Sequence, residues 1–166
     1  MDFSTLYDED TETWAELQVV ALRRLACTPG PWANAIDWEN VIEEVEDLGA
    51  ERRRAVESLL ENAFVHVLKI AADPDSLSAD HWRDEVQEFW EQARNKTKPA
   101  MRSRIDMQEI WERACKRASK ALEAFDRALP EVPESCPYSF DNVANDKFDP
   151  LRDLLMDIVV GRLPLE

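Results

Sequence analysis

The chain has 166 residues, of which 45% are hydrophobic and 33% charged, and these values fit one globular domain over residues 1–166. The formal net charge of -15 argues against nucleic-acid binding and against docking on anionic lipid, which both need clustered Lys and Arg. The 3 cysteines form no CxxC pair and no long apolar run occurs, so we expect a cytoplasmic protein with reduced thiols and no membrane span.

The first predicted helix covers Asp8 to Ala26. Acidic residues open it and Arg23 and Arg24 close it, an order that suits the dipole of a helix. An apolar stripe recurs along it at spacings of three and four residues. The stripe consists of Trp14, Leu17, Ala21 and Leu25, with Val20 one position off.

The second predicted helix begins at Trp38, after the N-cap residue Asp37, and continues to about Ala72. Its apolar stripe passes Gly49 without losing phase, so the pattern predicts one long helix that can bend at this glycine. The stripe consists of Val41, Val45, Leu48, Arg52, Ala55, Leu59, Ala63, Val67 and Ile70.

The remaining elements follow the same helical spacing. A third helix is predicted over residues 79–95, and a fourth over residues 99–129, with a local break at residues 103–106 and Phe125 on its apolar side. A proline-rich link follows, and a short C-terminal helix is predicted from Pro150 through Val160.

No segment alternates with a period of two for long enough to form a strand. Short links between long helices are typical of antiparallel neighbours. The sequence therefore predicts an all-α fold, an antiparallel bundle of about four long helices plus a short C-terminal helix.

The blocks LYDED…W, IDWENVIEEVEDLG, LL…H…LK, WR and CPYSF occur in this order. In this order they resemble the bacterial domain-of-unknown-function family twenty-nine over about residues 6–143, with a helical extension at about 149–161. The resemblance implies an all-helical bundle without an assigned activity, so it supplies no catalytic residues. The positions that match the family are Tyr7, Asp10, Trp14, Asp37, Trp38, Glu39, Asn40, Glu43, Glu44, Glu46, Leu48, Gly49, Arg52, His66, Trp82, Arg83, Cys136, Pro137 and Tyr138.

A row of carboxylates lies at the start of the second helix. Glu39, Glu43 and Glu46 share one helix face, and such a row can ligate Mg²⁺ or Mn²⁺. The favoured interpretation is a solvated acidic face that pairs with basic residues of the fourth helix. Those basic residues are Arg113, Lys116, Arg117 and Lys120.

His66 lies close to the inner face of the second helix. It is a candidate metal ligand or general base if Glu43 or Glu46 comes close to it. Along a straight helix Glu46 and His66 are about 30 Å apart, so they meet only if the helix breaks at Gly49. The favoured interpretation is therefore a half-buried histidine held by hydrogen bonds.

Trp38, Trp82 and Arg83 are candidate partner-binding residues, because Trp and Arg are enriched at the centres of protein interfaces. The first hypothesis is a non-enzymatic helical protein-binding module without a cofactor, for which a homodimer is one option. The alternative is a hydrolase that binds a divalent metal through Glu43, Glu46 and His66, with His66 as the base. A third is nucleic-acid mimicry by the acidic face.

Overall fold

The computed structural model describes residues 2–31, 34–129 and 131–154, and every regular element in these ranges is helical. The all-α prediction is therefore confirmed. Contacts divide the chain into two compact units. We call Met1–Arg54 with Lys98–Arg104 the hairpin unit, and Ala55–Thr97 with Ile105–Glu166 the bundle unit.

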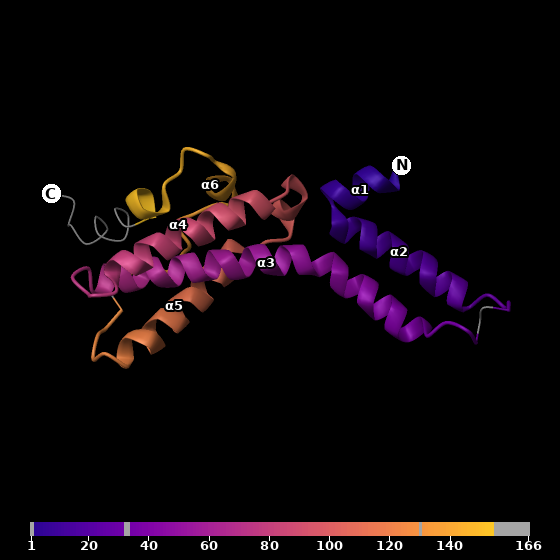
Figure 1. The fold of residues 1–166 in the computed structure, drawn as a ribbon, viewed down its shortest axis with the longest axis horizontal. Helices are drawn as coiled ribbons and strands as arrows, with labels where there is room; N and C mark the ends of the chain where they lie inside the picture. Colours follow the sequence, from indigo (N-terminus) through magenta and orange to yellow (C-terminus); the bar gives the residue numbers. More distant parts are fainter. Residues whose placement is uncertain (1, 32–33, 130, 155–166) are drawn as a thin grey trace. The chain divides into compact units, whose positions relative to one another are not determined.

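The hairpin unit contains α1 (Phe3–Glu9), α2 (Thr11–Ala26), the beginning of α3 (Trp38–Ala72) and the 3₁₀ helix η1 (Pro99–Ser103). Figure 1 shows α2 and the beginning of α3 running in opposite directions beside each other. The predicted long helix from Trp38 to Ala72 is present, and it is continuous through Gly49.

The first helix begins earlier than predicted and is interrupted at Asp10. The carboxylate of Asp10 accepts hydrogen bonds from the backbone N–H and the hydroxyl of Thr13, at 3.0 Å and 2.6 Å. This is an N-cap, which needs a non-helical backbone, so it ends α1 and starts α2. The prediction of one helix from Asp8 was wrong because its acids were interpreted only as partners of the dipole.

The bundle unit is built from the rest of α3, α4 (Ala79–Lys96), α5 (Met107–Glu123), the short α6 (Phe140–Ala144) and a π-helical turn, η2 (Pro150–Leu154). In Figure 1, α4 runs back along α3, and α5 crosses the same part of α3. None of the helices in the described ranges has the length and apolar character needed to cross a bilayer.

The fourth predicted helix is divided in the structure. Asp106 accepts hydrogen bonds from the backbone N–H groups of Gln108 and Glu109 and so starts α5 after the 3₁₀ turn. The helix ends at Glu123, and Asp126 has a φ of 54°. Phe125, expected on the apolar side, is 71% exposed because the helix has ended before it.

An aromatic cluster forms the core of the bundle unit. The ring of Phe64 on α3 lies 6.2 Å from that of Trp90, 5.5 Å from that of Trp111 and 6.1 Å from that of Tyr138, between centroids. The indole N–H of Trp111 donates to the carbonyl of Pro133, which holds the proline-rich link against α5. The largest fully buried side chains are Trp90, Trp111, Phe64, Leu60, Leu68, Ile70, Ile110, Val56, Val67 and Val86.

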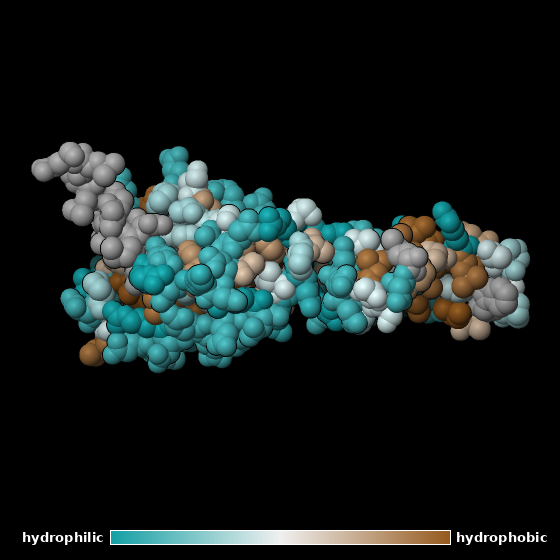
Figure 2. All heavy atoms as spheres, turned by 90° about the horizontal axis from the view of Figure 1, so that it is seen from above, coloured by the Kyte–Doolittle hydropathy of each residue, from teal (hydrophilic) through white to brown (hydrophobic). Residues whose placement is uncertain are grey.

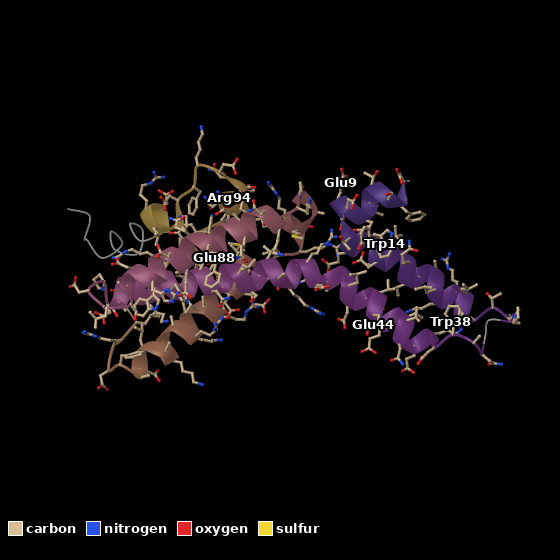
Figure 3. The ribbon with its side chains drawn as sticks, viewed as in Figure 1. Glu9, Trp14, Trp38, Glu44, Glu88 and Arg94 are labelled. Carbon is tan, nitrogen blue, oxygen red and sulfur yellow. The ribbon has the colours of Figure 1, made fainter. Side chains whose placement is uncertain are left out.

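The C-terminal part of the described chain is held by Arg94 of α4. Its guanidinium donates to the carbonyls of Val143 and Phe148, at 3.4 Å and 3.2 Å (Figure 3). The ring of Phe148 stacks on Trp90 at 5.2 Å. Of the predicted C-terminal helix, residues 150–154 form the π-helical turn, and the rest lies outside the described residues.

Candidate interaction surface

Small side chains bring α2 and α3 together in the hairpin unit. Thr11, Ala15 and Val19 are buried along α2, and Gly49 is buried on α3. A Cβ atom on Gly49 would lie 2.6 Å from the Cβ of Ala15, closer than two carbon atoms can pack. The two helices therefore approach through a glycine and an alanine, and their contact buries little apolar area.

Ion pairs fix the antiparallel order of the two helices. Glu12, near the start of α2, pairs with Arg53 at 3.2 Å, and Arg23, near its end, pairs with Glu46 at 2.7 Å. Arg104 adds a 2.8 Å contact to Glu16, and this hydrogen bond raises the pKa of the guanidinium. Each helix thus presents acidic residues first and basic residues later.

Aromatic residues support the start of α2. The rings of Tyr7 and Trp14 meet edge to face at 4.9 Å, and the guanidinium of Arg52 lies 5.3 Å from the centre of the Tyr7 ring. Cation–π contacts of this kind are worth about 0.5–1 kcal/mol at exposed sites. These matched family positions therefore have a structural role, namely to attach α1 to the hairpin.

The predicted apolar stripe of α2 does not face α3. Leu17 and Leu25 are 40% and 42% exposed, and Ala21 between them is exposed too. On α3, Val41 and Leu48 are 38% and 36% exposed. We call these five residues the hairpin face.

The five residues lie on the same side of the hairpin. At 3.6 residues per turn, Ala21 and Leu25 are turned about 100° from the buried Ala15, and Val41 and Leu48 are turned about 100° from the buried Gly49 in the same sense. Leu17 lies further round on that side of α2. In an antiparallel pair, equal turns in the same sense point to the same side. Figure 2 shows hydrophobic residues gathered over α1 and α2.

The opposite side of the hairpin is charged. A shallow groove of about 390 Å³ lies there, lined by Glu12, Glu16, Arg23 and Glu46 together with Ala15, Val19, Val20 and Gly49. A hairpin with one apolar side and one charged side has the amphipathic pattern of helices that pack against a further partner.

The candidate metal ligands fall in both units. Glu43 and Glu46 belong to the hairpin unit, where Glu46 pairs with Arg23, and both line an open depression of about 400 Å³. His66 belongs to the bundle unit. Among the residues that the structure describes, no three His, Cys, Asp or Glu side chains are grouped so that they could hold a metal ion.

His66 lies between α3 and α4 beside a carboxylate. Its Nδ1 is 2.9 Å from Glu85, but the two groups are not aligned as a hydrogen bond, and His81 lies 3.4 Å from the other oxygen of Glu85. Burial lowers the pKa of His66 despite the opposing effect of Glu85, so the imidazole is neutral at pH 7. We interpret this contact as a half-buried imidazole–carboxylate contact between α3 and α4, not as a full ion pair.

Two basic residues of α5 form ion pairs within the bundle unit, not with the acidic row at the start of α3. Arg113 and Arg117 both pair with Glu61 of the bundle unit, at 2.9 Å and 2.6 Å, and these hydrogen bonds outweigh burial to lower the pKa of Glu61. The predicted pairing of this basic stripe with the carboxylates at residues 39–46 is replaced, at these two arginines, by a pairing within the bundle.

The candidate partner-binding residues are also divided. Trp38 begins α3 in the hairpin unit and is half-buried (Figure 3). In the bundle unit, the Lys69 ammonium lies 4.6 Å from the centre of the Trp82 ring, and Arg83 pairs with Asp80 at 2.8 Å. The hairpin face itself was missed, although its α2 residues form the predicted stripe.

The described cysteines are free, and burial raises the pKa of the Cys115 thiol to about 11. Burial likewise raises the pKa of Cys136, whose backbone N–H donates to the side chain of Gln108 at 2.6 Å. A thiol with a raised pKa is a poor nucleophile at neutral pH. The backbone hydrogen bond from Cys136 to Gln108 attaches the proline-rich link to α5.

Comparisons with known proteins agree with this picture of a helical protein. The sequence pattern of the family described as "Domain of unknown function DUF29" matches residues 6–149. No curated protein matches the chain significantly. The fold is similar to the crystal structure of an alpha-helical protein of unknown function from Rhodospirillum rubrum ATCC 11170, with a TM-score of 0.75 and 27% identity, covering 95% of this chain and 98% of that one.

Proposed function

The chain belongs to the domain-of-unknown-function family DUF29, and from the geometry of its hairpin unit we propose that it is a non-enzymatic helical protein-binding module. The partner that we propose is an amphipathic α-helical segment, bound along the hairpin face. Trp38, at the start of α3, is the candidate binding residue that belongs to the same hairpin.

One observation carries the proposal. The two units differ in how far their apolar side chains are buried. All the largest fully buried side chains belong to the bundle unit. The exposed large hydrophobic residues, apart from Leu77 and Phe125, belong to the hairpin unit. An exposed apolar patch bordered by charged residues is typical of an interaction surface.

The hairpin face suits a helix better than an extended peptide. Its residues recur at helical spacing along two neighbouring helices, so the side-chain ridges of a third helix can pack against them. No unpaired strand edge exists in the described ranges to which an extended peptide could add.

In-cell photo-crosslinking tests the proposal. A photo-reactive residue at position 17 should crosslink to a protein that mass spectrometry identifies, and the peptide joined to it should be helical and amphipathic. The same residue at position 77 is the control, because Leu77 is fully exposed in the bundle unit, outside the hairpin face. Absence of any crosslink from position 17 would sink the proposal.

A further inference from the structure

We propose that the helix bound along the hairpin face is basic, with Lys or Arg beside its apolar stripe at two positions seven residues apart. This inference rests on the proposed function, because it names the chemical class of partner for the same surface. It is argued from two unpaired carboxylates at one edge of the face, from the contacts of the nearby cations and from the net charge of the chain.

Two glutamates border the hairpin face along the first part of α3, where Figure 3 labels one of them, Glu44. At 3.6 residues per turn, Glu44 is turned about 140° and Glu51 about 160° from the buried Gly49. The turn has the same sense as that of Val41 and Leu48. Both glutamates therefore lie on the outer shoulder of α3, on the side that carries the hairpin face. We call these two residues the acidic edge.

The carboxylates of the acidic edge are free to pair with a partner. Both glutamates are exposed, and neither side chain forms an ion pair or a hydrogen bond with any residue that the structure describes. They differ in this from Glu12, Glu16 and Glu46 on the charged side of the hairpin, whose carboxylates pair with arginines. A cation on a partner would not have to displace an arginine from the acidic edge.

The arginines that follow the acidic edge, at residues 52–54, already have contacts. The guanidinium of Arg52 lies 5.3 Å from the centre of the Tyr7 ring. Arg53 and Arg54 pair with other acidic residues, at 3.2 Å and 3.0 Å. These three cations therefore leave the two carboxylates of the acidic edge unpaired.

The cation Arg24 lies at the other edge of the hairpin. It is exposed and is turned about 180° from the contact with α3, on the outer side of α2. With helix axes about 9 Å apart, the outer sides of the two helices are roughly 20 Å apart. This exceeds the Debye length of about 8 Å at physiological ionic strength, so Arg24 does not neutralise the acidic edge.

A basic helix fits this edge, and an acidic one does not. Glu44 and Glu51 are seven residues apart, which places them about 10.5 Å apart along α3. A helix that runs along the hairpin face presents side chains with the same separation at positions i and i+7. The formal net charge of -15 also attracts a basic segment and repels an acidic one as they approach.

Fluorescence anisotropy of two designed peptides, titrated with the full chain, tests the inference. Both peptides have the 16-residue length of α2 and the same leucine stripe, and a side-chain staple on the outer face keeps them helical. Beside the stripe, one peptide carries Lys and the other Glu at two positions seven residues apart. The Lys peptide should bind at least about tenfold more tightly, because two ion pairs replace two like-charge contacts.

Two double variants locate the preference on the protein. Glu44→Gln with Glu51→Gln removes the acidic edge and should weaken binding of the Lys peptide about fivefold. Asp84→Asn with Glu91→Gln is the matched control, because these two exposed acids are also seven residues apart, on α4 of the bundle unit. It removes the same charge and should keep the preference of the parent.

The single variant Leu17→Gln tests whether the Lys peptide occupies the hairpin face, and it should weaken binding of this peptide. Three results would overturn the inference: equal binding of the two peptides, unchanged binding of the Lys peptide by the variant without the acidic edge, and an equal loss in the matched control. Binding that Leu17→Gln leaves unchanged would also overturn it, because the peptide would then lie elsewhere.

The crosslink from position 17 separates the inference from the proposed function. If neither peptide binds but position 17 crosslinks to an amphipathic helix, the inference fails while the proposed function stands. The same holds if the crosslinked helix carries acidic residues beside its apolar stripe. If position 17 gives no crosslink, both fail.

Discussion

The hairpin unit and the bundle unit use the same helical sequence pattern but bury their apolar residues differently. In the bundle unit, Phe64, Trp90 and Trp111 interlock and are fully or almost fully buried. In the hairpin unit, Ala15 and Gly49 make the closest contact, and Leu17 and Leu48 face solvent. An amphipathic stripe thus indicates that a helix has a partner, and only the structure reveals whether that partner lies in the same unit.

The largest difference between the units should appear on truncating one large apolar side chain in each. Phe64→Ala should lower the free energy of unfolding by about 3–5 kcal/mol, because it leaves a cavity in a packed core. Leu17→Ala should change it by less than about 1 kcal/mol in dilute solution, because the side chain is already partly hydrated. Urea unfolding followed by tryptophan fluorescence compares them, and equal losses would contradict the distinction between the units.

Gly49 tests the close helix contact within the hairpin. Gly49→Ala adds a Cβ that meets Ala15 at 2.6 Å, so the helices must separate, and overpacking of this kind destabilises by about 1–3 kcal/mol. The better helix propensity of Ala returns about 1 kcal/mol of that loss. Hydrogen exchange of the α2 amides should therefore speed up.

The exchanged pair, Gly49→Ala with Ala15→Gly, is the control for that experiment. It restores the space between the helices and leaves the summed helix propensity unchanged, so exchange in α2 should return close to the parent rate. If Gly49→Ala alone slows exchange in α2, the contact between the two helices is not as tight as the structure has it.

The bundle unit should carry a pH dependence that comes from His66. Burial between α3 and α4 lowers the pKa of His66, although Glu85 opposes this and Lys69, His81 and Arg117 reinforce it. The unfolded chain then binds the proton more readily, so stability is complete above about pH 6.5 and declines as the pH falls below it.

The His66→Gln variant removes that titration. Unfolding free energies measured from about pH 7.5 to about pH 5 should fall less steeply for the variant than for the parent. A parent protein that became more stable on acidification through this range would show that contact with Glu85, rather than burial, sets the pKa of His66.

Much of the fold could be predicted from the sequence, because apolar periodicity and helix caps are local signals. The helix at residues 79–95 matches α4, and the long second helix matches α3. The break at Asp10 was missed because a capping aspartate within an acidic run looks like any other acid near a helix start. The exposure of Phe125 was missed because α5 ends at Glu123 without a glycine to mark its end.

The candidate site was harder to predict than the fold. The stripe of Leu17, Ala21 and Leu25 was found, but periodicity cannot tell which face a neighbouring helix covers. Nothing in the residue pattern shows that Gly49 meets Ala15 and so turns the stripe away from α3. The candidates Glu43, Glu46 and His66 stood out by residue type, and the structure assigns them to two units.

The smallest expected effect concerns divalent metal ions. Addition of Mg²⁺, Mn²⁺ or Zn²⁺ to chelator-treated protein should leave the unfolding midpoint unchanged, because Glu46 is paired with Arg23 and His66 contacts Glu85. A bound ion at about 100 times its dissociation constant would add about 2.7 kcal/mol. A rise in the midpoint that Glu43→Gln abolished would instead favour the hydrolase hypothesis.

Native-state hydrogen exchange of the full chain tests the contrast between the units most directly. Amides of α2 should exchange much faster than those of α5, because the hairpin opens without disturbing the bundle core. Protection of α2 equal to that of α5 would contradict the account, because the hairpin would then be stable without a partner.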